Sequence, residues 1–436
     1  MKKKLKRKNR EFLLLLFVVI LIFSMYQFLL RPILKKSMAT EVIGTGITFI
    51  LLASVLITFL LVVLLCGYIF SFKVNRKKYA RRLVHYRKKS IIAALISIML
   101  LAGYTYYSQK NAYIKPLCNE YNDIIPTSIS DLEKIELNGN EQWISFKGID
   151  KSNPVLLVIG DGPGKSEMAR FNKSLEALQD DFVIVNWDEL GTGKSAKSVD
   201  ELTIDNYVSD GIELTKYLCQ KFNKQKIYVF GNSFGSTLGI LMIKNSPNLY
   251  EGFIGTSSVV SVKRNEEYRY NRAVEIAEGI EDEATLRKLK AQGEPGYDKN
   301  MYKKQKIYYD YLKMKENEDK KIDGNGYNSL NDIFSSEYGL LDKYNKIFAE
   351  KKIYDKIFKS YYDVDLISSA RELKVPVYFL QGNRDYLSSS ELLNEYFSVL
   401  NAPDKQIIWL EKSGSMPWIS EKEEFMKNIK KKLLNK

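Results

Sequence analysis

The chain has 436 residues and a formal net charge of +14, from 66 Lys/Arg against 52 Asp/Glu. A chain of this length is expected to form two or three structural units. Residues 1–107 hold 19 basic and 2 acidic residues, which leaves 47 basic and 50 acidic residues for the rest. The near-neutral remainder argues against a basic nucleic-acid-binding domain, so no nucleic-acid partner is expected.

Three long uncharged runs in the first quarter predict transmembrane helices at about 12–30, 43–70 and 91–107. About 20 apolar residues are needed to cross a bilayer, so the first two runs are long enough and the third is short but sufficient with its terminal tyrosines at the interface. A cleaved signal peptide is the alternative for the first run. It is disfavoured because no small-residue cleavage site precedes Arg31-Pro32.

The basic residues predict the orientation of these helices. Seven Lys/Arg precede the first run, and nine lie in the second loop, residues 73–89. The positive-inside rule therefore predicts a multi-pass cell-membrane protein with a cytoplasmic N-terminus and an extracytoplasmic C-terminal domain. The basic loop could also bind anionic lipid or nucleic acid, but the topology alone explains it.

A polar linker at 108–130 is expected to lead into an α/β domain at 131–436. Strands are predicted at 132–137, 142–147, 154–159, 182–187, 227–230, 253–260, 375–380 and 406–410, and helices at 167–178, 204–222, 236–244, 388–400 and 421–434. Such alternation predicts a mostly parallel sheet covered on both faces. A charged, helical insertion at about 261–370 holds 13 of the 29 tyrosines and is expected to cap the ligand-binding edge of the strands.

The most informative motif is Gly231-Asn232-Ser233-Phe234-Gly235, which follows the predicted strand 227–230 and precedes a helix-compatible segment. A G-x-S-x-G in a strand–turn–helix context predicts a nucleophile elbow, in which a strained turn exposes the serine hydroxyl. A serine in an ordinary turn is the alternative.

Other chemical motifs are weaker or excluded. Cys66, Cys118 and Cys219 are most simply unpaired thiols, although the last two could pair in an oxidising compartment. No Cys/His spacing predicts a metal site. The two Gly-Lys-Ser tripeptides, 164–166 and 193–195, lack the earlier glycine of a phosphate-binding loop, so nucleotide hydrolysis is excluded.

Five stretches in fixed order carry a resemblance to a known family: LLVIGDGPG at 156–164, VNWDELGTGKS at 185–195, GNSFGS at 231–236, VPVYFLQGNRD at 375–385 and LEKSGSMPW at 410–418. Residues 130–434 resemble the prolyl-aminopeptidase-like serine peptidases, and the start of the insertion, 260–277, resembles bacterial members. The resemblance implies an α/β-hydrolase fold after the membrane region, hydrolysis of peptide, amide or ester bonds, and no cofactor.

The resemblance also implies roles for individual residues. Ser233 matches the nucleophile and Asp385 matches the triad acid. The N–H of Phe234 and the turn containing Asp161 and Gly162 would form the oxyanion hole, although an inward Asp161 carboxylate would repel developing negative charge.

Two carboxylates at the start of the cap, Glu266 and Glu267, are candidates for binding the free amine of a peptide. The alternative is that they are ordinary solvated charges on a helix.

One residue of the family pattern is missing. The triad histidine is expected before Pro417, but Ser415 stands there, and the single histidine of the chain, His85, lies in the predicted cytoplasmic loop. Two further departures are the sequence Gly-Asp-Gly-Pro-Gly at 160–164 for the family's His-Gly-Gly-Pro-Gly and Asp-Glu-Leu-Gly at 188–191 for its Asp-Gln-Arg-Gly. A serine cannot act as the base, and loss of the base from such a triad costs on the order of 10⁶ in turnover.

Three hypotheses follow. The domain descends from a serine hydrolase and its activity is lost or strongly reduced, as in a pseudoenzyme. Alternatively, its tyrosine-rich cap and pocket bind a short peptide or small molecule without turnover, as a sensor or partner subunit. In the third, it remains an enzyme through substrate-assisted or Asp-only activation of Ser233.

Overall fold

The computed structural model describes residues 43–44, 46–47, 50, 95–96, 98–197, 201–296, 300–323, 332 and 334–435. The chain divides into two compact units, one of residues 1–112 with 334–341 and one of residues 113–333 with 342–436. The first predicted transmembrane segment, 12–30, lies outside the described residues, and the second, 43–70, is described only at 43–44, 46–47 and 50. Of the third, 91–107, the described residues 95–96 and 98–107 are helical. Within the part of the chain that is described, no helix has both the length and the apolar character needed to span a bilayer.

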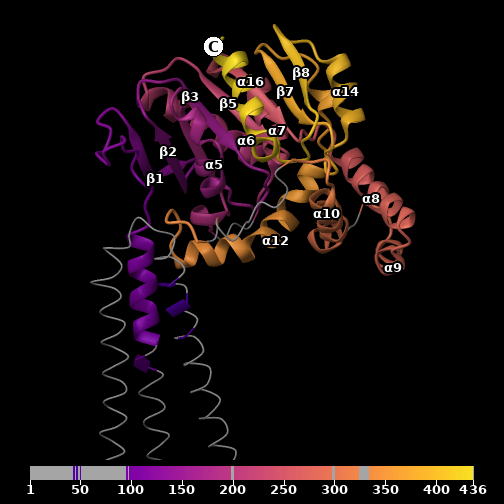
Figure 1. The fold of residues 1–436 in the computed structure, drawn as a ribbon, viewed down its shortest axis with the longest axis horizontal. Helices are drawn as coiled ribbons and strands as arrows, with labels where there is room; N and C mark the ends of the chain where they lie inside the picture. Colours follow the sequence, from indigo (N-terminus) through magenta and orange to yellow (C-terminus); the bar gives the residue numbers. More distant parts are fainter. Residues whose placement is uncertain are drawn as a thin grey trace, which may run out of the picture. The chain divides into compact units, whose positions relative to one another are not determined.

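The second unit is built on an eight-stranded sheet with the order β1-β2-β4-β3-β5-β6-β7-β8 (Figure 1). Its strands are β1 (Ile129–Leu137), β2 (Asn140–Gly148), β3 (Val155–Ile159), β4 (Val183–Asp188), β5 (Ile227–Asn232), β6 (Tyr250–Thr256), β7 (Val377–Gly382) and β8 (Lys405–Leu410). The β1–β2 and β2–β4 pairs are antiparallel and the others are parallel. The prediction of a mostly parallel sheet is therefore confirmed.

Helices connect the strands and form the insertion. The connecting helices are α5 (Met168–Ser174), α6 (Ile204–Lys221), α7 (Phe234–Asn245), α14 (Ser390–Val399), α15 (Pro417–Ser420) and α16 (Lys422–Leu434). The insertion carries α8 (Val262–Gly279), α9 (Glu283–Gln292), α10 (Met301–Glu318), α12 (Leu340–Tyr362) and α13 (Leu366–Ser369). Figure 1 shows α8, α9, α10 and α12 together on one side of the sheet.

Most element boundaries lie one to three residues from the sequence prediction, and two elements differ further. The single helix predicted at 167–178 is α5 followed by a short 3-10 turn at Glu176–Leu178. The strand predicted at 253–260 is β6, which ends at Thr256 because Ser257 takes a left-handed φ of 46° that no strand can continue through.

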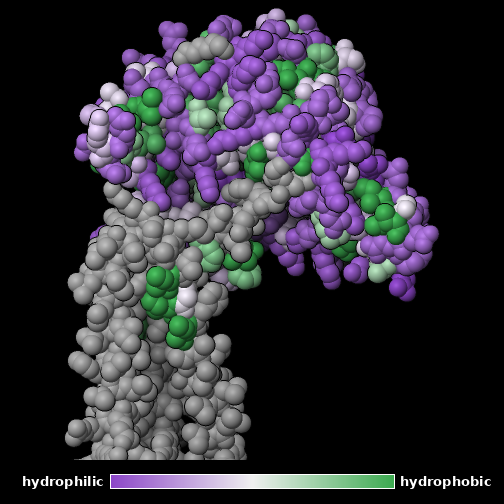
Figure 2. Space-filling model, in the orientation of Figure 1, coloured by the Kyte–Doolittle hydropathy of each residue, from purple (hydrophilic) through white to green (hydrophobic). Residues whose placement is uncertain are grey.

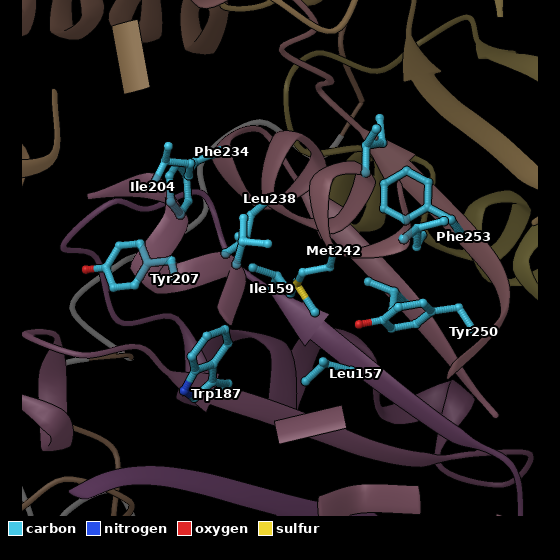
Figure 3. Close-up of a cluster of buried hydrophobic side chains, with 14 of the residues drawn as sticks. Leu157, Ile159, Trp187, Ile204, Tyr207, Phe234, Leu238, Met242, Tyr250 and Phe253 are labelled. Atoms are coloured by element: carbon cyan, nitrogen blue, oxygen red, sulfur yellow. The ribbon is translucent and has the colours of Figure 1, made fainter. Parts of the chain in front are cut away.

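Alternate residues of the central strands point to two hydrophobic cores, one on each face of the sheet. In β3, Leu157 and Ile159 belong to the core that contains α6 and α7, whereas Leu156 and Val158 belong to the core that contains α5 and α16. Figure 3 shows the first core, where β3 side chains meet Leu238 of α7 and its neighbours. This two-sided burial explains why the strand has no polar residue.

The ends of the insertion are held together at the sheet. Ser261 and Asp365 form an antiparallel bridge, with the amide of Val262 donating to Val364 at 2.9 Å and the amide of Leu366 donating to Val260 at 2.8 Å. The cap therefore begins and ends at one point, just beyond the carboxyl end of β6. That end of the strands is where Ser233 lies.

Candidate active site

Ser233 lies in a sharp turn between β5 and α7, as the motif predicted. Its φ of 53° and ψ of −110° are strained for a residue with a side chain. The turn is fixed by two hydrogen bonds: the Ser233 amide donates to Thr256 O at 3.0 Å, and Ser236 Oγ donates to Ser233 O at 2.7 Å. The half-buried Ser233 side chain lines two cavities under the cap.

The two motif glycines permit a very close approach of backbones. A Cβ on Gly231 would lie 2.3 Å from Gly235 O, and a Cβ on Gly235 would lie 2.3 Å from Ile159 O. The Gly235 amide also donates to Gly160 O at 3.0 Å. The end of β3 and the start of α7 therefore touch through main-chain atoms alone.

Asp385, the predicted triad acid, is buried in the loop after β7. Its Oδ1 accepts the amides of Leu387 at 2.7 Å and Ser388 at 3.0 Å. Its Oδ2 accepts Gln381 Nε2 at 2.9 Å and the hydroxyls of Ser257 and Ser388. Burial and the nearby charge of Glu316 raise the pKa of Asp385 above its ordinary value. The carboxylate thus holds its own loop and the end of β6 together.

Ser415, at the expected histidine position, is buried and bound to the cap helix α10. Its hydroxyl donates to Glu316 Oε1 at 2.6 Å and its amide donates to Glu316 Oε2 at 3.1 Å. Glu316 Oε2 also accepts the amide of Tyr386 at 3.1 Å. Gly414 makes room for this carboxylate, since a Cβ there would lie 2.6 Å from Glu316 Cδ.

Lys313, one helical turn before Glu316, completes this cluster. Its Nζ lies 2.7 Å from Ser415 Oγ and 3.1 Å from Glu316 Oε1. Ser233, Ser257, Lys313 and Ser415 line one cavity of about 430 Å³. An ammonium paired with a carboxylate donates hydrogen bonds and cannot accept a proton, and a neutral serine hydroxyl is no base. His85 lies outside the described residues.

The predicted oxyanion donors differ in their availability. Phe234 is the first residue of α7, so its N–H has no partner one turn earlier in the helix. The amide of Asp161 instead donates to Glu167 Oε2 at 2.6 Å. Because this bond occupies the Asp161 amide, that amide is not available to an oxyanion, contrary to the prediction. Gly162 is the remaining candidate donor in the turn.

The Asp161 carboxylate lines both cavities near Ser233. Burial opposes its charge, but Lys165, 3.4 Å away, and Arg170 outweigh that effect and hold the pKa of Asp161 below its ordinary value. An ionised carboxylate at this place opposes the development of negative charge on a substrate oxygen.

The two cap carboxylates have different surroundings. Glu266 is buried and lines a cavity of about 110 Å³ beside Ser233, where it accepts Arg269 at 2.5 Å and the hydroxyl of Tyr308. It is therefore not a solvated helix charge, but its negative charge is already compensated by Arg269. Glu267 is half-buried and lines neither of the two cavities beside Ser233.

Two buried acids, Asp188 and Glu189, lie at the carboxyl end of β4. Burial raises the pKa of Asp188 to about 6 and that of Glu189 to about 8, and the charge of Asp188 adds to the shift of Glu189. Asp188 accepts Ser166 Oγ at 2.5 Å and the Lys194 amide at 2.8 Å, whereas Glu189 Oε1 is buried with no hydrogen-bond partner. Glu189 therefore carries a proton near neutral pH.

Several known proteins are similar to this chain in sequence. The profile of the family described as "Serine aminopeptidase, S33" matches residues 156–314. The "Probable aminopeptidase YbaC" of Bacillus subtilis (strain 168) is 26% identical over 310 residues, which cover 67% of this chain and 93% of that protein. A "Proline iminopeptidase" of Heyndrickxia coagulans is 22% identical over 288 residues, covering 65% and 92%.

Solved structures show the same fold. The proline iminopeptidase of Mycobacterium smegmatis superposes with a TM-score of 0.53 at 16% identity, covering 70% of this chain and 98% of that one. VinJ superposes with a TM-score of 0.52 at 16% identity, covering 71% and 99%. These likenesses show that the chain has the α/β-hydrolase fold. Its α/β-hydrolase domain is the second unit described above.

Three residues that hydrogen-bond to Asp385 or Ser415 could not be found from the sequence. Ser257 contacts Asp385 across 128 positions of the chain, and Lys313 and Glu316 reach Ser415 across 102 and 99. The only signal for the last two was their spacing of three on a helix, which is common on any charged helix.

The close approach at the elbow predicts that Gly231→Ala and Gly235→Ala will each destabilise the domain. Because the added Cβ would meet backbone oxygen at 2.3 Å, the strand or helix must move, and we expect a loss of about 2–5 kcal/mol. Thermal unfolding of the purified full chain measures the effect. Gly279→Ala is the control, since it has open space at the end of α8 and should change stability by less than about 0.5 kcal/mol. Equal unfolding temperatures for all three variants would contradict the packing at the elbow.

The buried Glu189 predicts a domain that loses stability as pH rises. Its pKa is about 8 when folded against an ordinary 4.5, so the folded state binds more protons over this interval and unfolding becomes easier with increasing pH. Between pH 6.5 and 8.5 we expect the Glu189→Gln variant to lose less stability than the unmodified chain, by at most about 1.4 kcal/mol per pH unit.

Thermal unfolding across this range, with Glu201→Gln at an exposed position as control, tests the pH effect. The interpretation is wrong if Glu189→Gln and the unmodified chain show the same slope. Asp188, with a pKa near 6, acts in the same direction but has largely titrated below this range.

Proposed function

We propose that this chain is a membrane-anchored relative of the serine aminopeptidases whose Ser233 site receives short peptides, amides or esters but turns them over very slowly or not at all. The observation that carries the proposal is the occupant of the histidine position. The Ser415 hydroxyl donates a hydrogen bond to Glu316 and accepts one from Lys313, so the side chain at the place of the triad base is not a proton acceptor.

The expected chemical consequence is large. Attack by Ser233 requires removal of its hydroxyl proton, and a general base supplies about 10²–10⁴ in rate by itself. Asp385 is a poor substitute because five donors already bind its carboxylate, which holds its lone pairs away from Ser233. What remains is the strained nucleophile and the Phe234 donor, which support binding better than turnover.

Binding without turnover is supported by the preserved cavity. A cavity of about 430 Å³ lies beside Ser233, and its size suits a dipeptide or a similar small molecule. Its lining alternates basic and acidic side chains, among them Lys165, Arg170, Asp332 and Glu350. A zwitterionic ligand would match this mixed charge better than a purely apolar one. Sensing or a partner-subunit role would follow from such binding.

The proposed location follows from the sequence of the first 107 residues. Three membrane spans would place the N-terminus in the cytoplasm and the α/β-hydrolase domain outside it, with the lipid bilayer as a partner. No cofactor is needed for the proposed chemistry, because a serine hydrolase forms its covalent intermediate with the enzyme's own hydroxyl.

The decisive experiment is labelling of the full chain, in detergent or nanodiscs, with a fluorophosphonate probe that reacts only with activated serines. We expect the unmodified chain to label no faster than Ser233→Ala. In the double variant Ser415→His/Lys313→Ala, loss of the Lys313 side chain makes room for the new imidazole. Glu316 is kept because it accepts the amides of residues 386 and 415. Labelling at Ser233 should rise by about 10²-fold or more in this variant.

Ser398→His, at an exposed position of α14, is the matched control for adding a histidine elsewhere and should leave labelling unchanged. Rapid labelling of the unmodified chain at Ser233 would overturn the proposal and make the protein an active hydrolase. A folded double variant that remains unlabelled would show that the missing base is not the main defect.

A further inference from the structure

The outward face of α12 has an unusual distribution of side chains. Leu341, Tyr344, Ile347 and Phe348 follow helical spacing and are 52–61% exposed. Asp342 and Lys343, in the same turns, are only 3% and 4% exposed. A water-facing helix normally exposes its charges and buries its apolar side chains, so this half of α12 is inverted. Figure 2 shows hydrophobic surface along this helix.

A buried ion pair fixes the orientation of this first half of α12. Asp342 accepts Lys194 Nζ at 2.8 Å, with both side chains almost fully buried. Breaking such a buried pair would leave an uncompensated buried charge, so rotation of the helix to hide Tyr344 and Phe348 is strongly disfavoured. The exposed apolar face is therefore a fixed feature of the fold.

The same face changes character further along the helix. After Phe348 it presents exposed Lys351, Lys352, Asp355 and Lys359 in place of apolar side chains. The apolar part is thus confined to the first two turns or so. A surface that is apolar at one end and charged at the other fits an environment that changes from hydrocarbon to water along the helix.

We propose that this apolar end of α12, defined as Leu341, Tyr344, Ile347 and Phe348, contacts the lipid of the membrane that anchors the chain. The argument for lipid comes from the chain itself. The amide of Leu340 donates to Ser108 Oγ at 3.2 Å, and the amide of Leu341 donates to Gln109 Oε1 at 3.3 Å. Ser108 directly follows the uncharged run 91–107.

The inference rests on the proposed membrane anchoring. If the run 91–107 spans the bilayer, Ser108 and Gln109 mark the membrane surface, and the first turn of α12 is bonded to that level. Tyrosine and phenylalanine are suited to the interface, where a ring can lie among acyl chains while its edge or hydroxyl remains near the headgroups.

The contact would also define the class of ligand. Ile347 of this face and Glu350, one turn later, both line the cavity beside Ser233. An amphiphile in the outer leaflet could therefore enter the cavity without crossing water. The class that fits is a peptide, amide or ester attached to a hydrocarbon chain.

The test places an environment-sensitive fluorophore (NBD) at single cysteines in the full chain, reconstituted in vesicles of phosphatidylcholine and phosphatidylglycerol. Cys66, Cys118 and Cys219 are first replaced by serine. Phe348→Cys is compared with Lys359→Cys, which lies on the same helical face about 16 Å further along. We expect blue-shifted emission at position 348 that nitroxide-labelled lipid quenches, and water-like emission at 359 that aqueous iodide quenches.

The outcomes separate this inference from the proposed anchoring. If position 348 is as water-exposed as 359 while the chain resists extraction by alkaline carbonate, the lipid contact is wrong and the anchoring stands. If carbonate releases the chain, the anchoring itself fails. Cross-linking between two copies through position 348, without lipid quenching, would identify the face as a dimer interface and would also overturn the lipid contact.

Discussion

The site depends on main-chain contact between the end of β3 and the start of α7. Gly235 lies against Ile159 and Gly160 so closely that any side chain there would displace backbone, and the Gly235 amide is bonded to Gly160 O at 3.0 Å. This contact fixes Ser233 and the Gly160–Gly164 turn relative to each other. Because it involves no catalytic side chain, the hydrolase architecture can persist when the chemistry of the triad changes.

Glu316 binds the residue at the predicted histidine position and the loop beside it. Its carboxylate accepts two amides, one hydroxyl and one ammonium, and hydrogen bonds to a charged group contribute about 1.5–3 kcal/mol each. These bonds join the cap helix α10 to the two loops that carry Asp385 and Ser415. A catalytic histidine must be free to gain and lose a proton, whereas this cluster stabilises a single arrangement. These contacts hold α10 in one arrangement against the two loops, which fits the proposed loss of turnover.

The sequence was sufficient for features that depend on local pattern. The apolar strands, the strand–turn–helix around Ser233 and the place of Asp385 after a strand all follow from periodicity or spacing, and the helical insertion follows from a break in that alternation. What it could not predict depends on contacts between distant segments. The bond from Ser257 to Asp385 joins the ends of two strands across 128 positions, and the bond from Ser415 to α10 forms only when the insertion folds onto the sheet. The bond from the Asp161 amide to Glu167 spans only six positions, but no motif in the sequence signals it. The first two predicted membrane spans lie almost wholly outside the described residues, and all three stay predictions.

The charge around the oxyanion turn opposes hydrolysis independently of the missing base. Asp161 faces the cavity with a lowered pKa, and burial together with the Asp161 charge raises the pKa of Glu167. Glu189, which carries a proton near neutral pH, stands where the resembling family has a glutamine, and Leu190 where it has an arginine. A tetrahedral intermediate would place its negative oxygen near the ionised Asp161, in a buried site where charge repulsion is poorly screened. A histidine at position 415 would restore proton transfer but not this field, so its gain in rate should fall short of a complete triad's. A ligand whose positive group meets Asp161 faces no such penalty, which makes this polarity suitable for binding an amine-bearing molecule.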